Sequence, residues 1–450
     1  MQTAAVARET GLWKRGVFWL LLLAPLFFST YNFSNWYTGQ RDDVGTLVFA
    51  WEQQIPLWAW TIVPYWSIDL LYGLAFLLPV SRAEVDRLGL RLLSAQIICI
   101  ACFLLWPLRF TFDRPELDGL FGAMFDVLMG FDKPFNQAPS LHITLLVVLW
   151  AYYGKHLQGG WRYLLHGWFA LIGLSVLTTW QHHFIDVPTG MLAGFICLWL
   201  WPSEGRSPLL AWRLARTAKH WKMAGLYALA AAALCTVAIQ FSGVALWLLW
   251  PALSLLLVAL NYALFDAQGF QKRSDGRLSL ANSWLLAPYL AAAWLNSRAW
   301  TRKHPQADEV VEGIWLGRIP GKDGSSAFSS IVDLCAELPC RANVTAYRSI
   351  PALDLIPLSL EQCKEAANSI ESLRRSGAVL VCCALGYSRS AMAVAAWLIL
   401  SGRCKSIDAV LEYLCKARPS IVLGSAHLHT LHVLLNERHP SAALEIIHDQ

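Results

Sequence analysis

Long apolar stretches run through the first 266 residues of this 450-residue chain. Each is about 17–25 residues long, which is the length that a helix needs to cross the hydrocarbon core of a bilayer. The chain is 56% hydrophobic and only 15% charged, and its 23 tryptophans are too many for an ordinary soluble enzyme. We therefore predict a multi-span α-helical membrane bundle of about eight spans, near residues 16–34, 58–79, 89–107, 140–157, 161–179, 184–201, 223–241 and 244–264.

Basic residues gather in the loops on one side of this bundle. Lys14 and Arg15 precede the first span, and clusters of lysine and arginine follow the second, fourth, sixth and eighth spans. Because cytoplasmic loops are enriched in these residues, this side and both termini are predicted to be cytoplasmic. The segment from Asn282 to Asn296 is apolar but short and contains Pro288. We expect a membrane-surface or re-entrant helix there rather than a ninth span.

The C-terminal part contains a loop that begins with Cys383 and ends with Arg389. An apolar run at 378–381 precedes this loop, and a helical run at 391–400 follows it. A buried strand that leads through a loop into a helix directs several backbone N–H groups at one point, which makes an anion site. A cysteine at its start is favoured as a nucleophilic thiolate, and an arginine at its end can bind phosphate with two hydrogen bonds. The non-functional alternative is a buried structural cysteine with a helix-capping arginine.

This loop resembles that of the cysteine-dependent dual-specificity phosphatases, whose pattern is His-Cys-x-x-Gly-x-x-Arg-Ser/Thr. Cys383, Gly386, Arg389 and Ser390 match the pattern, while Cys382 occupies the histidine position. The resemblance implies a compact α/β domain in which Cys383 attacks phosphorus and Arg389 holds the phosphate oxygens. It also implies that Ser390 helps to discharge a phosphocysteine intermediate.

The same resemblance assigns further residues of this domain. The segment 350–354 corresponds to the one in which that family places its general acid, which implies Asp354 as proton donor to the leaving oxygen. Gly386 and Ser388 are implied as phosphate ligands, and the chemistry requires neither a cofactor nor a metal. We expect strands near 313–316, 331–334 and 379–382, and helices near 360–374, 391–401, 406–417 and 426–436.

Histidines and an aspartate lie at the opposite, outer ends of two predicted spans. His142 opens the span near 140–157, and His182 and Asp186 open the span near 184–201. Polar residues are costly in such apolar surroundings and are functional candidates by default. His182 and Asp186 are four residues apart, hence on one helical face if the helix has already begun at His182. The aspartate can then hold one imidazole nitrogen and leave the other as nucleophile or base. His142, from another helix, can then protonate a leaving group.

These residues resemble the type-2 phosphatidic acid phosphatase superfamily, and within it the inositolphosphotransferase branch. The motif Pro-Ser-Gly-His is matched at 139–142 with leucine for glycine, and Ser-Arg-x5-His-x3-Asp is matched with Val176 in place of arginine. The resemblance implies a phosphohistidine on His182, which Asp186 orients, and His142 as general acid. The candidate phosphate ligands of this site are Arg109, Arg114, Lys133 and Ser140.

The whole chain resembles bacterial fusions of these two domains. We predict a polytopic membrane domain, a basic linker with a surface helix, a dual-specificity-phosphatase-like domain and a tail, at 1–266, 267–305, 306–437 and 438–450 respectively. The predicted protein lies in the bacterial inner membrane, with its histidine site facing the periplasm.

The predicted function is that of a bifunctional membrane phosphatase. A lipid phosphate or phosphodiester is hydrolysed or transferred at the histidine site. A phosphomonoester, on a lipid or on a phosphotyrosine, phosphoserine or phosphothreonine, is hydrolysed at the cysteine site. In the alternative, the membrane domain transfers lipid headgroups and the C-terminal domain is a regulatory phosphate-recognition module. Phospholipid, phosphoprotein and membrane are the expected partners, and nucleic acid is not.

Overall fold

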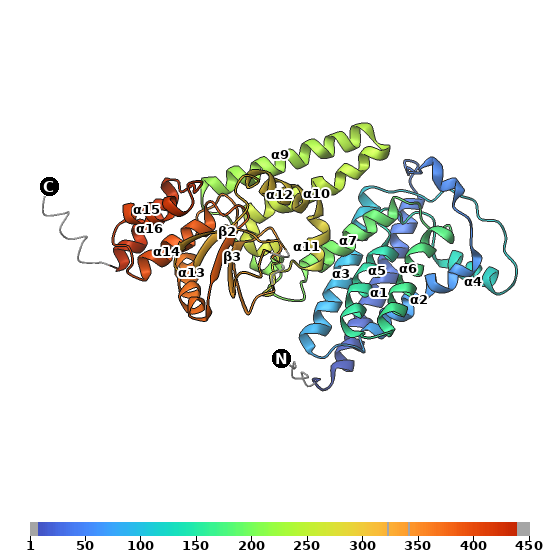
Figure 1. Ribbon diagram of the computed structural model, residues 1–450. Coiled ribbons are helices and arrows are strands. Elements are labelled where there is room, and N and C mark those ends of the chain that lie inside the picture. The colour runs from blue at the N-terminus through green and yellow to red at the C-terminus, as the bar shows by residue number, and fades with distance from the viewer. Residues whose placement is uncertain (1–7, 322–323, 341–342, 439–450) are drawn as a thin grey trace. The chain divides into compact units, whose positions relative to one another are not determined.

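The chain folds as two compact units, which divide between Ser203 and Glu204. The computed structural model describes residues 8–321, 324–340 and 343–438. The first unit is helical, and the second combines helices with a sheet (Figure 1). The long helices that follow residue 217 belong to the second unit, although the sequence placed them in the membrane domain that ends at 266. Of the predicted tail, only Arg438 is described, and it ends the last helix.

The helices of the N-terminal unit follow the apolar stretches of the sequence, with one addition. A helix that the sequence did not predict, α4, forms within the predicted loop that precedes the first histidine motif. The elements are α1 (Leu12–Gly39), η1 (Ala50–Gln54), η2 (Ala59–Thr61), α2 (Ile62–Ala75), α3 (Arg82–Leu105), α4 (Gly119–Phe131), α5 (Leu141–His156), α6 (Trp161–Thr178) and α7 (Asp186–Leu200).

Two glycines of α7 let this helix approach α5 closely. A Cβ atom on Gly190 would lie 2.8 Å from Cβ of Ile143, and one on Gly194 would lie 2.6 Å from Cβ of Val147. Small residues at such a contact allow two helix backbones to pack together without lipid between them. The start of α5, which carries His142, and the start of α7, which carries Asp186, are thereby held side by side.

Four helical segments of the described residues are long and apolar enough to cross a membrane, which indicates a membrane-associated protein. The other predicted spans form helices of 14 to 18 residues. The predicted count of eight spans is therefore not supported. The sequence window at 58–79, for example, included residues that form a 3-10 turn before α2 and irregular chain after it. The four segments are Leu12–Gly39, Arg82–Leu105, Ala218–Phe241 and Gly243–Phe270.

The C-terminal unit forms a helical hairpin near its start and continues into an α/β domain. The hairpin consists of α9 (Ala218–Phe241) and of a helical run made of η3 (Gly243–Leu248), α10 (Leu249–Leu260), η4 (Asn261–Phe265) and η5 (Asp266–Phe270). The remaining elements are α8 (Pro208–Ala211), α11 (Leu280–Leu285), α12 (Ala287–Trp300), β1 (Asp308–Val311), β2 (Ile314–Arg318), β3 (Ser330–Cys335), β4 (Ala346–Ala352), α13 (Leu360–Leu373), η6 (Arg374–Ser376), β5 (Val379–Cys383), α14 (Arg389–Leu400), α15 (Ile407–Ala417) and α16 (Ser425–Arg438).

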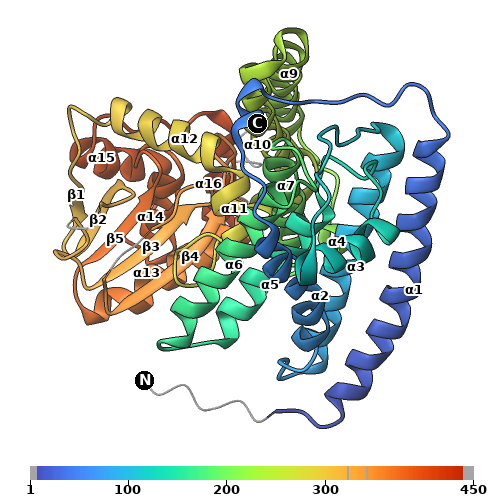
Figure 2. The same ribbon diagram turned by 90° about the vertical axis from the view of Figure 1, so that its right-hand side faces the viewer.

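A five-stranded sheet in the order β1-β2-β5-β3-β4 forms the centre of this unit (Figure 2). Only β1 pairs antiparallel, and the buried strand β5 lies between β2 and β3 in parallel. Each face of β5 contributes to a different core, with Val381 against α13 and α14 and Leu380 against Ile331 and Ala293 of α12. The three predicted strands and four predicted helices of this domain are present, within a few residues of their predicted ends, while β1 and β4 were missed.

The segment predicted as one membrane-surface helix forms two helices, α11 and α12, separated at Leu286. Ala293 of α12 packs on the sheet, whereas Trp294 and Leu295 are exposed. The inner face of α12 therefore belongs to the α/β domain, and its contact with a membrane remains a prediction.

A buried lysine ties the chain that follows the hairpin to the α/β domain. The ammonium of Lys272 donates to Oδ2 of Asp333 at 2.6 Å and to the carbonyls of Cys335 and Leu338 at 2.6 and 2.8 Å. Both charged side chains are fully withdrawn from solvent. Burial alone would lower the pKa of Lys272, but the charge and hydrogen bond of Asp333 and the nearby thiols of Cys335 and Cys340 together raise it. Lys272, predicted to lie in a linker, is thus part of the core of this domain.

Replacement of Lys272 should therefore destabilise the C-terminal unit strongly. Lys272→Met leaves the carboxylate of Asp333 buried without its partner, and breaking such a pair costs about 3–5 kcal/mol. Arg273→Met is the matched control, because the neighbouring Arg273 pairs with Glu204 while both side chains are about half exposed, at 43% and 54%. We expect a large shift in the unfolding transition of the full chain in detergent for Lys272→Met and a small one for Arg273→Met. Equal shifts would contradict the structural role of Lys272.

Candidate active sites

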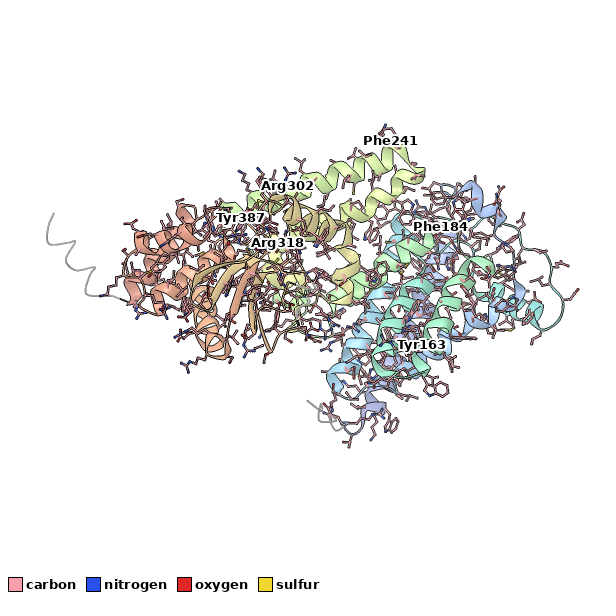
Figure 3. The ribbon with its side chains drawn as sticks, viewed as in Figure 1. Tyr163, Phe184, Phe241, Arg302, Arg318 and Tyr387 are labelled. Atoms are coloured by element: carbon pink, nitrogen blue, oxygen red, sulfur yellow. The ribbon has the colours of Figure 1, made fainter. Side chains whose placement is uncertain are left out.

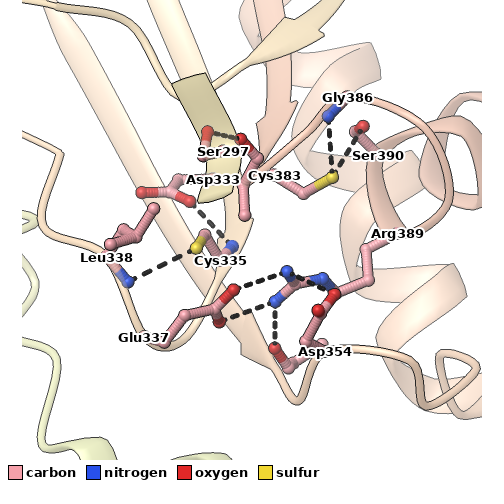
Figure 4. Close-up of polar contacts among 12 residues, drawn as sticks. Ser297, Asp333, Cys335, Glu337, Leu338, Asp354, Cys383, Gly386, Arg389 and Ser390 are labelled. Atoms are coloured by element: carbon pink, nitrogen blue, oxygen red, sulfur yellow. Dashed lines mark hydrogen bonds and ion pairs between the residues drawn. The ribbon is translucent and has the colours of Figure 1, made fainter. Parts of the chain in front are cut away.

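The cysteine loop closes around the sulfur atom of Cys383. β5 ends at this residue and α14 begins at Arg389. The backbone N–H of Gly386 donates to Sγ of Cys383 at 3.2 Å, and Oγ of Ser390 lies 3.2 Å from the same sulfur (Figure 4). The sulfur thus lies at the start of a helix, where backbone N–H groups converge. The structure thus brings together the predicted nucleophile, the loop glycine and the predicted discharging serine.

Gly386 is required by the shape of this loop. Its φ is +76°, and a Cβ atom there would lie 2.4 Å from the carbonyl carbon of Gly317 on β2. Any side chain at this position would both strain the backbone and push the loop away from the sheet. The loop can therefore stay tight around the sulfur only with glycine at position 386.

Residues outside the cysteine loop hold its other backbone and side-chain groups. Ser297 of α12 donates to the carbonyl of Ala384 at 2.6 Å, and the N–H of Val422 donates to the carbonyl of Tyr387 at 2.9 Å. The hydroxyl of Ser388 lies 2.9 Å from Nε2 of His427. Ser388, predicted as a phosphate ligand, thus engages α16, and its contact with phosphate remains a prediction.

Arg389 is held by two carboxylates. Its Nη1 and Nη2 donate to both oxygens of Glu337 at 2.8 and 2.6 Å, and Nη2 also donates to Oδ1 of Asp354 at 2.9 Å (Figure 4). The side chains of Arg389 and Glu337 are only 2% and 4% exposed, whereas that of Asp354 is 39% exposed. Arg389, the predicted phosphate ligand, and Asp354, the predicted general acid, are therefore in contact. Glu337 is an additional partner that the sequence did not reveal.

The two carboxylates differ in the direction of their pKa shifts. For Glu337, burial would raise the pKa, but the charge and hydrogen bonds of Arg389 hold it below the ordinary value. For Asp354, withdrawal from solvent raises the pKa and the charge of Glu337 adds to the rise, so that Arg389 does not reverse it. Glu337 is thus the permanent counter-ion of Arg389, and Asp354 is the carboxylate that holds a proton more readily.

Cys382, which occupies the position of the family's histidine, lies on the other face of the sheet from Cys383, the predicted nucleophile. Cys383 belongs to the core beside α13 and α14, and Cys382 to the core beside Ile331 and Cys340. A hydrogen bond with Cys340 and then burial raise the pKa of the Cys382 thiol. Cys382 is therefore a neutral core side chain, as the alternation of strand residues requires.

The predicted histidine dyad is assembled in the N-terminal unit. Nδ1 of His182 lies 2.9 Å from Oδ2 of Asp186, and its Nε2 lies 3.1 Å from Oγ of Ser140. All three side chains are buried, and the second aspartate oxygen accepts the N–H of Ala138 at 2.9 Å. The imidazole is fixed through one nitrogen, and the other nitrogen faces the start of α5.

His142, the predicted general acid, lies against an aromatic ring. Its ring stacks on that of Tyr65 of α2, with centroids 4.1 Å apart. Its Nε2 is withdrawn from solvent and has no hydrogen-bond partner within the part of the chain that the structure describes. An imidazole nitrogen in that state is available to a substrate atom.

The predicted phosphate clamps of this site have other partners. Arg114 donates to the carbonyls of Thr179 and Trp180 at 3.1 and 2.8 Å, and Lys133 donates to a carbonyl of α4 at the surface. Arg109 and Arg114 line a cavity of about 600 Å³ together with Gln181, the residue before His182. Lys133 is not among the lining residues. The two arginines therefore remain candidate phosphate ligands of this cavity.

Two partners of the histidine pair could not be expected from the sequence. Glu52 lies 3.1 Å from Nδ1 of His183 and accepts the N–H of Phe184 at 2.8 Å. Oε1 of Gln137 lies 3.3 Å from Nδ1 of His182. Glu52 thus makes His183 a supporting residue of the loop. Within the described residues, no group of three His, Cys, Asp or Glu is arranged to hold a metal ion.

A strand, a tight loop with a cysteine at its start, and a helix that begins with a buried arginine are the features expected of a cysteine-dependent phosphatase domain. Residues 340–437 match the family described as dual specificity phosphatase, catalytic domain. The C-terminal part of the chain is therefore a dual-specificity phosphatase catalytic domain, and the protein is a phosphatase. No curated protein matches the chain.

Solved phosphatase structures are similar to the C-terminal part. Human DUSP28 is 20% identical over 30% of this chain and 95% of its own, with a TM-score of 0.27. A mouse putative dual specificity phosphatase complexed with zinc tungstate is 22% identical over 31% of this chain and 91% of its own, with a TM-score of 0.28. PTPMT1 in complex with PI(5)P is 17% identical over 30% of this chain and 98% of its own, with a TM-score of 0.26.

Loss of the thiol should abolish phosphomonoesterase activity. Cys383→Ser replaces the nucleophile by a hydroxyl that the loop does not ionise, so turnover of a generic phosphomonoester should fall by about a thousandfold or more. Cys382→Ala is the matched control, because this neighbour faces the opposite core. Phosphate release measured on the full chain should be near normal in the control. Activity that survives in Cys383→Ser would exclude Cys383 as nucleophile.

Proposed function

We propose that this chain is a bifunctional membrane phosphatase with one cysteine site and one histidine site. The observation that carries the proposal is the contact of Sγ of Cys383 with the N–H of Gly386 and the hydroxyl of Ser390, beside the doubly held Arg389. The cysteine site hydrolyses a phosphomonoester, on a lipid or on a phosphoprotein. The histidine site acts on a lipid phosphate ester.

At the cysteine site, substrate binding rearranges the contacts of Arg389. A phosphate dianion that enters the loop competes for Nη2 of Arg389 with Asp354, the more exposed of its two carboxylates. Glu337 keeps the guanidinium in place throughout, since both of its oxygens are engaged. Asp354, released and protonated, then faces the leaving oxygen.

The chemical steps at this site follow from those positions. The thiolate of Cys383 attacks phosphorus, the bond to the leaving oxygen breaks, and Asp354 transfers its proton to that oxygen. Ser390, 3.2 Å from the sulfur, stabilises the thiolate as it leaves in the second step. Water attacks the phosphocysteine, Asp354 takes up a proton, and phosphate departs.

At the histidine site, Nε2 of His182 attacks the phosphorus of a lipid phosphate. Asp186 holds the proton on Nδ1, which directs the lone pair of Nε2 to the substrate. His142, with its free Nε2, protonates the leaving oxygen. A phosphohistidine forms and is discharged to water or to an acceptor hydroxyl.

Transfer to an acceptor is the second candidate function of the histidine site. Val176 at the position of the family's arginine and the His-His-x-x-Asp form favour the inositolphosphotransferase-like branch. The cytoplasmic domain would in that case be a regulatory phosphate-recognition module. An added alcohol or lipid that captures the phosphate group would distinguish a transferase from a hydrolase.

The apolar helices and the basic loops bear on where the protein lies in the cell. We place the protein in a bacterial inner membrane with about eight apolar segments, both termini in the cytoplasm and the histidine site facing the periplasm. The basic loops support this orientation. Reporter fusions after residues 110 and 300 would test it, with the first expected outside and the second inside.

The effect of Asp354→Asn on the rate of hydrolysis should depend on the leaving group of the substrate. Asp354→Asn removes the proton donor, so hydrolysis of an alkyl phosphate should fall by about a hundredfold or more, and hydrolysis of p-nitrophenyl phosphate much less. Because the pKa of Asp354 is raised, its acid form persists to higher pH, and activity should fall as pH rises through that pKa. The variant should lack this falling limb. Equal losses with both substrates would contradict the assignment.

His182→Asn should abolish release of phosphate from a lipid such as phosphatidic acid in proteoliposomes. The experiment is made in a Cys383→Ser background, so that only the histidine site contributes. A loss of about a thousandfold is expected because no other group replaces the nucleophile. His166→Asn on α6 is the control, since His166 contacts Trp150 and Arg162 outside the site. Persistent activity in His182→Asn would refute the phosphohistidine step.

A further inference from the structure

A basic cavity lies at the open end of the helical hairpin of the C-terminal unit. Its volume is about 410 Å³, and it is bounded by the extended chain before α9 and by η4 and η5. Arg206, Arg213 and Arg216 line it together with His220 and Tyr262. Neither the cysteine loop nor the histidine site contributes to its lining.

The backbone places two of these arginines. The N–H of Arg213 donates to the carbonyl of Leu264 at 2.8 Å, and the N–H of Ala215 donates to the carbonyl of Ala263 at 2.9 Å. Both acceptors belong to η4, a π-helical turn. Backbone hydrogen bonds therefore hold the chain from Trp212 to Arg216 against the turn that follows α10. They fix the positions of Arg213 and Arg216 without any contact of the arginine side chains.

The cavity has an excess of positive charge. Its one acidic lining residue is Asp266, whose carboxylate accepts the N–H of Ala267 at 2.7 Å. Within the described residues, no carboxylate forms a salt bridge with Arg206, Arg213 or Arg216. Guanidinium groups without an internal counter-ion beside a concave surface are suited to bind phosphate oxygens.

The surroundings of the cavity are those of a membrane surface. α9 begins and the second helical run ends at the cavity, while Phe241, 74% exposed, lies at the opposite tip of the hairpin (Figure 3). Both arms are candidate membrane spans. Leu210, Trp212 and Leu214, beside the arginines, are exposed by 78%, 56% and 60%. Exposed tryptophan and leucine next to arginine at a span end are typical of the headgroup region.

We propose that this cavity binds the phosphate of an anionic phospholipid headgroup from the bilayer that the hairpin enters. Arg213 and Arg216 hold the phosphate, and Trp212 and Leu214 contact the adjoining acyl region. Tyr262 forms a wall of the cavity and donates to the backbone carbonyl of Asp354 at 3.0 Å. The lipid site therefore adjoins the segment that carries the acid of the cysteine site, although it does not depend on catalysis there.

Lipid binding to the purified full chain tests this proposal. The protein is delipidated in detergent and titrated with phosphatidylglycerol or phosphatidylcholine, and bound lipid is counted by native mass spectrometry. Arg213→Gln with Arg216→Gln should weaken phosphatidylglycerol binding by about tenfold or more, since each lost charge weakens attraction to an anionic headgroup. Arg375→Gln with Lys405→Gln is the matched control, because these exposed basic residues lie on elements that do not line the cavity.

Three outcomes would overturn the proposal. The first is equal phosphatidylglycerol binding by the two double variants. The second is equal affinity of the unmodified chain for phosphatidylcholine and phosphatidylglycerol. The third is displacement of the lipid by equimolar inorganic phosphate, which would make the cavity a site for a soluble anion. The unfolding transitions of both double variants show whether a folding defect explains a loss of lipid binding. The activity of Cys383→Ser is measured separately, so that an inactive cysteine site is not mistaken for a loss of lipid binding.

Discussion

The bidentate ion pair between Arg389 and Glu337 is the contact on which the cysteine site depends. Both side chains are almost fully buried, so neither charge is stable without the other. Glu337 follows β3 and Arg389 is the first residue of α14, so the pair ties the end of a central strand to the catalytic helix. The loop between Cys383 and Arg389 is stretched between two fixed points, β5 and this pair. The N–H of Gly386 can therefore be aimed at the sulfur before any substrate is bound.

The histidine site follows the same physical principle on a different architecture. A buried carboxylate, Asp186, holds His182 through Nδ1, and the other ring nitrogen lies 3.1 Å from Oγ of Ser140. In place of a sheet, the close packing of α5 and α7 at Gly190 and Gly194 fixes the distance between the two motifs. In each candidate site a buried carboxylate thus holds a basic side chain in place: Glu337 holds Arg389, and Asp186 holds His182. Such preorganisation costs no rearrangement at the moment of reaction.

Contiguous motifs were predictable from the sequence, and distant pairings were not. The loop from Cys383 to Arg389 encodes its own geometry, because strand, glycine turn and helix follow one another directly. Glu337 gives no local signal, since its partner Arg389 is 52 residues away, and Glu52 is 131 residues from His183. The count of eight spans is not supported, because the apolar stretches on which it was based continue through 3-10 turns and loops that end the helices. The orientation of Arg114 toward backbone carbonyls likewise depends on a loop whose path no sequence pattern defines.

The central claim is that phosphate is transferred to Cys383 in the C-terminal domain, and trapping of the intermediate tests it most directly. Ser390→Ala should slow the discharge of phosphocysteine, because the hydroxyl 3.2 Å from the sulfur is lost. The variant is mixed with a labelled phosphomonoester, quenched in acid within one turnover, digested and sequenced. The account predicts that the label is found on the peptide that contains Cys383. Label found only on the peptide that contains His182, or on neither peptide, would contradict it.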